Sequence, residues 1–468
     1  MRITSWLAAP LVIAACGPSL ASQVSTVGSL ASVRDLPELK EGDVNPSSTA
    51  NVARLLEQPL DADAAVRIAL LNNRELRARL RELGISASEL ITAGTIANPT
   101  VELELLPERD SKYELRVEYD LTSLLMAPLR RSAANDELEA ARLTAAGDVI
   151  QLGYDARTRF YALQAAQQRL GLRQQSLEAL AAARDAAQAL VDAGNINPLD
   201  AASQIAAYER SRVDVALLEL DVAERREELQ RLLGLHGDQT RWQIKAALPD
   251  VPDELRLPED LERAALEANL DLRAAHVGLA ALSKQTGIAR TEGWLPEVVA
   301  DVHALRVEDD PGEPNEQDWR WGAGVSLQVP LFDRGQGRLQ GIESRFDATS
   351  ERYQGLAVEV RSMARDARSR LESSQARARQ YRTVILPAQR AVLDQTLLQY
   401  NAMQLGIFEL LSARRELLDV ELAYVDSLRD YWSARAEIEA LTRGRVVRAA
   451  ETSRSMPLAA ASASQGGH

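Results

Sequence analysis

The side chains best suited to metal binding or nucleophilic chemistry are few in this chain, with four histidines and one cysteine. The histidines are scattered, and none lies at metal-ligand spacing from another histidine or from the cysteine. They are His236, His276, His303 and His468. We therefore expect no catalytic centre, no resident metal and no cofactor, and we do not expect an enzyme.

The single cysteine, Cys16, lies close to the N-terminus. It follows an apolar run from Ile3 that is too short to span a bilayer and is typical of a secretory signal. Residues 13–16 resemble a bacterial lipobox, which predicts a signal peptide over residues 1–15 and fatty acyl chains such as palmitate on Cys16. Gly17 then favours sorting to the outer membrane. The alternative is an ordinary signal peptide with an incidental cysteine.

Charged and apolar residues alternate strictly in one part of the chain. Side chains in a strand switch face at every residue, so residues 98–106 and 113–121 are expected to be strands with one apolar and one charged face. Residues 297–306 and 319–329 repeat the pattern less cleanly. The charged positions that we expect to face a water-filled lumen are Glu102, Glu104, Glu114, Arg116, Glu118 and Asp120.

Two architectures contain strands with one apolar and one charged face. A soluble sheet packed on helices also has one apolar and one polar face. A membrane β-barrel is favoured by strands of about ten residues, which cross a bilayer when tilted, by aromatic residues near the strand ends and by the export signal. Four strands cannot close a barrel, and unpaired backbone edges in lipid cost several kcal/mol per group. Several chains would then have to contribute four strands each.

The elements around these strands occur twice. Residues 65–78 and 261–274 align without a gap, which indicates a tandem duplication. Each strand pair is followed by a long helix, expected at residues 130–193 and 337–403, and by a returning helix, expected at 198–233 and 408–441. Pro387 is expected to bend or divide the second long helix. Only 4% of the residues are aromatic, which favours long packed helices over ordinary globular cores.

The expected fold is mainly α with a small β part, in a duplicated helix–strand–strand–helix frame with coiled-coil-like helix pairs. The expected organisation is a signal peptide at 1–15, a lipidated flexible tether at 16–58, a first repeat at 59–234, a second repeat at 255–444 and a flexible tail at 445–468. The formal net charge of -14 makes a nucleic acid an unsuitable partner, because phosphate binding needs a basic face.

Over residues 59–444 the chain resembles the TolC-type outer-membrane efflux proteins. The resemblance rests on residues 98–100, 329–335 and 400–414, in that order within the duplicated frame. It implies a homotrimer in the outer membrane of a Gram-negative bacterium, with a twelve-stranded barrel continued by a helical barrel in the periplasm. It also implies a periplasmic adaptor (membrane fusion) protein and an inner-membrane transporter of the resistance-nodulation-division type as partners.

The same resemblance points to a periplasmic aperture. In the duplicated frame, Asp200 corresponds to Glu409 near the tips of the two helical hairpins. The family constricts its tunnel there with acidic residues and with an aspartate bonded to a tyrosine and an arginine. Asp200 and Tyr400 match the first two, whereas the arginine position falls on Leu405. The alternative is that Asp200 is an early-turn residue favoured by the helix dipole.

The expected function is a passive outer-membrane conduit of a tripartite efflux system. Residues 400–415 look most like members that serve heavy-metal cation exporters, so metal cations are one expected cargo and organic compounds the other. The first alternative function is a structural coiled-coil lipoprotein that spans the periplasm without a pore. The second, a metal-sequestering lipoprotein, is disfavoured by the lack of clustered metal ligands.

Overall fold

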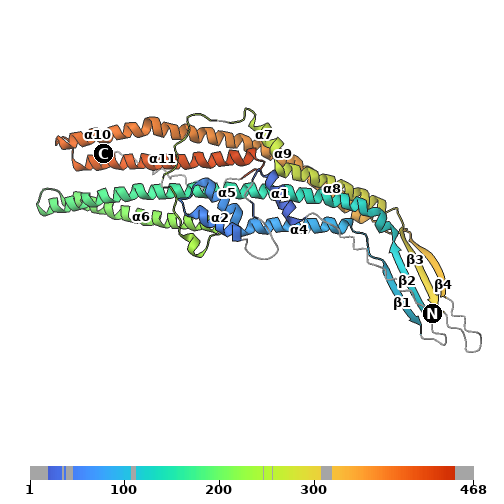
Figure 1. The fold of residues 1–468 in the computed structure, drawn as a ribbon. Coiled ribbons are helices and arrows are strands. Elements are labelled where there is room, and N and C mark those ends of the chain that lie inside the picture. The colour runs from blue at the N-terminus through green and yellow to red at the C-terminus, as the bar shows by residue number, and fades with distance from the viewer. Residues whose placement is uncertain are drawn as a thin grey trace, which may run out of the picture.

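The structure is a computed structural model, and it describes residues 19–33, 36–37, 46–106, 112–245, 247–255, 257–306 and 319–447. The expected signal peptide, the lipid site at Cys16 and most of the expected C-terminal tail lie outside these ranges. Within them the molecule is elongated, with a sheet at one end and long helices running to the other (Figure 1).

The two halves of the chain contain the same elements in the same order. The first half contains α3 (Ala62–Asn72), α4 (Arg74–Gly94), β1 (Thr100–Leu106), β2 (Lys112–Asp120), α5 (Leu121–Asp192) and α6 (Pro198–Leu233). The second half contains α7 (Leu261–Ala268), α8 (Leu270–Glu292), β3 (Glu297–Arg306), β4 (Trp319–Gln328), α9 (Gln336–Gln380), the π-helical turn η2 (Tyr381–Ile385), α10 (Leu386–Asn401) and α11 (Ile407–Thr442). A short 3-10 helix, η1 (Gly237–Thr240), follows the first half.

One asparagine in each half separates two helices at corresponding positions of the repeated segment. Asn73 separates α3 from α4, and its Oδ1 accepts a hydrogen bond from the Leu76 backbone N–H at 2.8 Å. Asn269 separates α7 from α8 and caps in the same way, with Leu272 N–H at 2.7 Å. Asparagine is a preferred N-cap because its side chain satisfies an orphan donor of the first turn. The same break between two helices therefore occurs at corresponding positions.

Helix α5 starts earlier than expected. It begins directly after β2 with Asp120 as its N-cap and continues through Pro128, so the expectation that the helix starts beyond this proline was wrong. Proline cannot donate the usual backbone hydrogen bond to the preceding turn. The donor missing at Pro128 is the one that would bond the Leu124 carbonyl, and Arg130 donates from its guanidinium to the neighbouring Ser123 carbonyl at 2.7 Å. The helix continues for 72 residues.

The second long helix is divided, as the position of Pro387 predicts. Helix α9 ends at Gln380, the turn η2 follows, and Pro387 lies in the first turn of α10. The missing N–H of Pro387 leaves one acceptor of the preceding helical turn without its usual donor. The five-residue π-helical turn adjusts the backbone just before it. No helix in the described ranges is long and apolar enough to cross a membrane.

The core lies among the helices. One cluster of buried side chains includes residues of α1 (Leu20–Leu30), α2 (Pro46–Leu56), α3, α4, α5 and α6. A second cluster joins α7, α9 and α11 to the middle of α5. On α9 its members are small or branched and follow one another at spacings of four, three, four and seven residues, namely Val360, Ala364, Ala367, Leu371 and Ala378. This spacing produces a narrow apolar seam typical of coiled-coil packing.

The N-terminal region differs from the expected flexible tether. Residues Leu20–Leu30 form helix α1 and Pro46–Leu56 form α2. Val24 and Val27 of α1 are buried, and the buried Gln23 accepts a hydrogen bond from Arg142 Nε of α5 at 2.6 Å. The tether expectation was therefore wrong for these helices, because α1 carries an apolar stripe that packs on the helical body.

The start of the expected tail is also ordered. Arg445 forms an ion pair with Asp271 at 2.6 Å, and Val447 is buried. Residues 445–447 therefore belong to the folded body, and the expectation of a flexible tail from Arg445 onward was wrong for them.

The segment between the two halves crosses the helices as a strap, which we define as residues 243–245 and 247–253. The buried Gln164 of α5 donates from Nε2 to the carbonyls of Lys245 and Ala247 at 2.9 and 2.8 Å. Gln375 of α9 donates to the Pro252 carbonyl at 2.9 Å. The strap has little regular structure, so its backbone groups rely on these side chains.

The other end of the strap is bound by α11 and by η2. Trp432 Nε1 donates to the Pro249 carbonyl at 2.9 Å, and the Tyr424 hydroxyl donates to Asp250 Oδ1 at 2.7 Å. Burial, followed by the hydrogen bond to Asp250, raises the pKa of the Tyr424 hydroxyl. Arg382 of η2 binds Asp253 Oδ1 at 2.6 Å. The strap thereby fastens both halves to one another.

We expect Gln164→Leu to release the strap, because the substitution leaves two carbonyls without their donor. Each unsatisfied group costs about 1–3 kcal/mol, so hydrogen exchange of the strap amides should accelerate by at least about tenfold. Gln167→Leu on the same helix is the matched control, since within the described residues it is Gln164, and not Gln167, that donates to the strap carbonyls. Equal protection in the two variants would contradict this role of Gln164.

Candidate functional sites: a two-faced sheet and paired helix tips

The sheet brings the predicted charged residues to one face. Its strands lie in the order β1-β2-β3-β4, all antiparallel. Glu102 is opposite Arg116, which is opposite His303, which is opposite Gly322, so one row crosses all four strands. By the alternation along each strand, all six predicted positions share this polar face with Asp301 and His303.

The other face is apolar and uncovered. Val101 of β1 is 63% exposed and Trp321 of β4 is 75% exposed. Leu115 and Val302 on the two central strands are exposed too. Figure 1 shows the helices continuing from one end of the sheet rather than lying across it. The alternative of a soluble sheet packed on helices does not fit this arrangement, because such a sheet would bury its apolar face.

The polar face carries more negative than positive charge. Arg116 Nη2 binds Glu114 Oε1 at 2.8 Å, and Nη1 lies 3.9 Å from Glu118 Oε1. Glu104 is directly opposite Glu114, and Glu118 is directly opposite Asp301. Like charges opposite one another destabilise a sheet. The face is therefore suited to attracting cations rather than to maximising stability.

The two helical hairpins, α5–α6 and α10–α11, have the same type of turn at their tips. Gly194 after α5 has φ 71° and Met403 after α10 has φ 58°, both in the left-handed region. Asn195 N–H donates to the Leu190 carbonyl at 2.8 Å, and Gln404 N–H donates to the Gln399 carbonyl at 2.9 Å. Both are Schellman C-caps, in which a left-handed residue closes the last turn. Methionine occupies a conformation that glycine adopts without strain.

The predicted aperture residues lie beside these turns. Asp200 and Glu409 are each the third residue of the returning helix, α6 or α11, where a carboxylate is favoured by the helix dipole. Glu409 folds back over Gly406, with Oε2 2.8 Å from where a Cβ would lie. Tyr400 is in the last turn of α10, and Leu405 is partly buried in the following turn. No hydrogen bond joins Tyr400 to Asp200 among the described side chains of the single chain.

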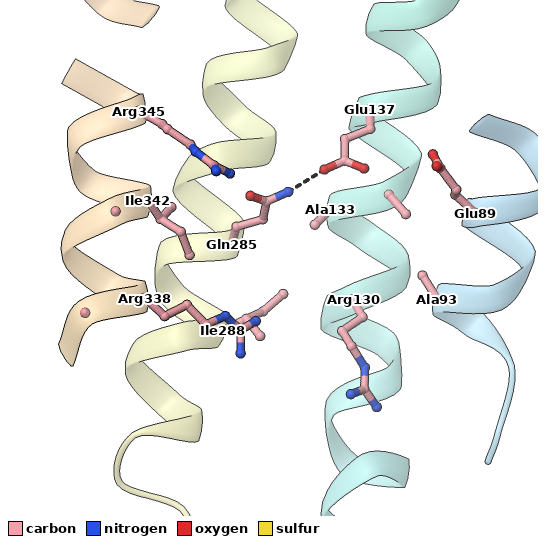
Figure 2. Close-up of a pocket in the computed structure, with 13 residues that line it drawn as sticks. Glu89, Ala93, Arg130, Ala133, Glu137, Gln285, Ile288, Arg338, Ile342 and Arg345 are labelled. Atoms are coloured by element: carbon pink, nitrogen blue, oxygen red, sulfur yellow. Dashed lines mark hydrogen bonds between the residues drawn. The ribbon is translucent and has the colours of Figure 1, made fainter. Parts of the chain in front are cut away.

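A groove lies between four helices close to the sheet. Its volume is about 740 Å³, and it is lined by α4, α5, α8 and α9 (Figure 2). Glu89 and Glu137 line it on one side and Arg345 on the other. Gln285 donates a hydrogen bond to Glu137. Burial, and then the nearby Glu89, raise the pKa of the Glu137 carboxyl, while the Gln285 bond acts in the opposite direction.

Sequence reasoning missed this groove, because its residues come from four helices whose neighbourhood depends on the tertiary fold. Within the residues that the structure describes, histidine, cysteine and acidic side chains form no group of three or more that could hold a metal ion.

The sequence and the fold of this chain are similar to those of several known proteins. Residues 261–443 match the family described as outer membrane efflux protein. The cobalt-zinc-cadmium resistance protein CzcC of Cupriavidus metallidurans is 26% identical over 418 residues, covering 85% of this chain and 94% of that protein. The crystal structure of CusC aligns with a TM-score of 0.69 at 17% identity, covering 82% of this chain and 92% of that one. The open-state MtrE outer membrane channel of Neisseria gonorrhoeae aligns with a TM-score of 0.64 at 18% identity, covering 82% and 89%.

The elongated helical fold with a two-faced sheet, together with these matches, defines an outer-membrane channel protein. The match to the outer membrane efflux protein family covers residues 261–443, and the likeness to the solved outer-membrane channels extends over most of the chain. It is an efflux channel of the outer membrane and not an enzyme.

The two hairpin turns predict opposite effects of exchanging their left-handed residues. Met403→Gly should relieve the strain of a side chain at positive φ, which is about 1 kcal/mol, and Gly194→Met should introduce it. Hydrogen exchange of the amides that close the turns, at Gln404 and Asn195, should slow in the first variant and accelerate in the second. A change of the same sign at both turns would show that the backbone conformation does not control them.

Proposed function

We propose that three copies of this chain form the outer-membrane channel of a tripartite efflux system. Each copy contributes β1 to β4 to a closed twelve-stranded barrel. The observation that carries the proposal is the sheet with an uncovered apolar face, a charged face and two unpaired edge strands, β1 and β4. Closure with neighbouring copies pairs the edges and leaves the apolar face toward lipid, because open sheet edges do not occur in a bilayer.

The helices provide a second surface for neighbouring copies. Val213, Leu217 and Leu220 of α6 are exposed at successive spacings of four and three residues. Such a stripe is typical of a coiled-coil seam that a partner helix covers. It supports a helical barrel made from the α5–α6 and α10–α11 hairpins of three chains, extending into the periplasm. A coiled-coil lipoprotein without a pore does not account for a sheet that has one exposed apolar face and one charged face.

The partners that complete such a system are a periplasmic adaptor protein and an inner-membrane transporter of the resistance-nodulation-division type. The cargo that we propose is a heavy-metal cation. The similarity to a cobalt-zinc-cadmium resistance protein supports this class. The negative polar face supports it too, because a lumen lined with carboxylates raises the local concentration of cations.

We also propose that Cys16 carries a covalent lipid that anchors the chain to the outer membrane. Three positions after Cys16, Ser19 caps helix α1 by accepting a hydrogen bond from Ser22 N–H at 3.3 Å. Helix α1 packs on the helical body through Val24 and Val27. A lipid at Cys16 would therefore be connected by a short segment to the folded part of the chain.

The barrel is tested by placing arginine on the two faces of β4 at adjacent positions. Val325 lies on the apolar face, so Val325→Arg should place a charge toward lipid at a cost of about 2–4 kcal/mol near mid-membrane and lower the yield of trimer in extracted outer membranes. Ser326→Arg is the matched control on the polar face, and trimer yield should be near that of the parent. Equal losses for both variants would contradict a barrel with its polar face inward.

The aperture is tested at the helix tips. We propose that Tyr400 and Asp200 hold the tunnel mouth narrow in the trimer, through a charge-assisted hydrogen bond of about 1.5–3 kcal/mol per copy, and that Glu409 adds to an acidic ring. Leu405 in place of arginine weakens this lock. Asp200→Ala combined with Tyr400→Phe should raise single-channel conductance in planar bilayers, whereas Glu409→Gln should mainly reduce cation preference. Parental conductance in the double variant, with unchanged selectivity in Glu409→Gln, would place the gate elsewhere.

A further inference from the structure

Two residues of β3, Asp301 and His303, form a hydrogen-bonded pair on the polar face of the sheet. His303 Nδ1 lies 2.9 Å from Asp301 Oδ2, and both side chains are partly buried. A carboxylate bonded to one ring nitrogen fixes the orientation of an imidazole. The hydrogen bond to Asp301 therefore holds the imidazole of His303 in a defined position on the polar face.

Glycines on β4 make room for this pair. Gly322 is directly opposite His303, and Gly324 is directly opposite Asp301. A Cβ atom at Gly322 would overlap the imidazole, and one at Gly324 would overlap the carboxylate. Glycine weakens a strand interior and often marks close approach of another group. Here the two glycines allow the side chains of β3 to lie across β4.

The charged groups around the imidazole come from β2 and β4. From β2, Arg116 is directly opposite His303, and Glu118 is opposite Asp301. Arg116 already interacts with Glu114 and Glu118 on its own strand. From β4, Arg320 lies two residues from Gly322 on the same face. Carboxylates and guanidinium groups ordinarily keep their charge between pH 5 and 8, whereas imidazole ordinarily changes its charge in that range.

We propose that His303, seated by Asp301, Gly322 and Gly324, determines how the ion selectivity of the channel depends on pH. The proposal rests on the barrel of the proposed function, in which the polar face lines the lumen. Neutral His303 leaves the wall predominantly negative, which attracts cations. Protonation adds one positive charge per chain in the middle of that wall, so the preference for cations falls as the pH falls.

Reversal potentials of the full-length channel in planar bilayers, with asymmetric potassium chloride at pH 8 and pH 5.5, test the proposal. The cation-to-anion permeability ratio of the parent should fall by roughly twofold or more on acidification. His303→Gln should keep the ratio of the parent at pH 8 and lose most of its pH dependence. His303→Lys should have a low ratio at both pH values, because it carries a fixed charge. His276→Gln is the control, because His276 lies on α8 beside Tyr353 and outside the sheet.

The outcomes separate this proposal from the proposed function. Conductance with a ratio that does not change with pH, or a His303→Gln channel that keeps the pH dependence of the parent, overturns the role of His303 and leaves the channel intact. Absence of conductance in the parent overturns the barrel and with it this proposal. A pH dependence lost equally in His276→Gln would also overturn the assignment to His303.

Discussion

The arrangement of the chain depends on one constraint: one face of its sheet is predominantly apolar, and the residues that the structure describes leave most of it uncovered. In a soluble α+β protein, helices would lie on that face and bury it. Here Val101, Trp321 and their neighbours remain exposed, and the helices continue from the end of the sheet. The core must therefore form elsewhere, and it forms between long helices whose contact positions are largely alanine and leucine.

This displacement of the core makes α5 the central element of the molecule. The middle of α5 takes part in both buried clusters, which also contain residues of α6, α9 and α11. Two helical hairpins that only touched along α5 could slide or separate. The strap prevents this, because Gln164, Gln375 and Trp432 bind its backbone from three different helices. A segment without regular structure can do this only when its carbonyls are satisfied by side chains.

Much of this fold could be predicted from the sequence, because its signals are local and periodic. Alternation located all four strands, and the repeated segment indicated the duplication, whereas the helix breaks at Asn73 and Asn269 within that segment appear only in the structure. The strap could not be predicted, since its order comes from distant donors such as Trp432 rather than from its own pattern. The pairing of His303 with Gly322 could not be predicted either, because it depends on the register of β3 against β4. The start of α5 was missed because Pro128 was taken to precede the helix, whereas the helix begins at Leu121 and continues through this proline.

The polar face also follows from the constraint on the apolar one. Strict alternation means that strands with apolar residues toward one side must place all other residues toward the opposite side. On that side, Glu104 faces Glu114 and Glu118 faces Asp301, although like charges opposite one another weaken a sheet. Glycines at Gly322 and Gly324 weaken β4 further. A face selected only for stability would contain neither feature, whereas a face with unbalanced negative charge attracts cations.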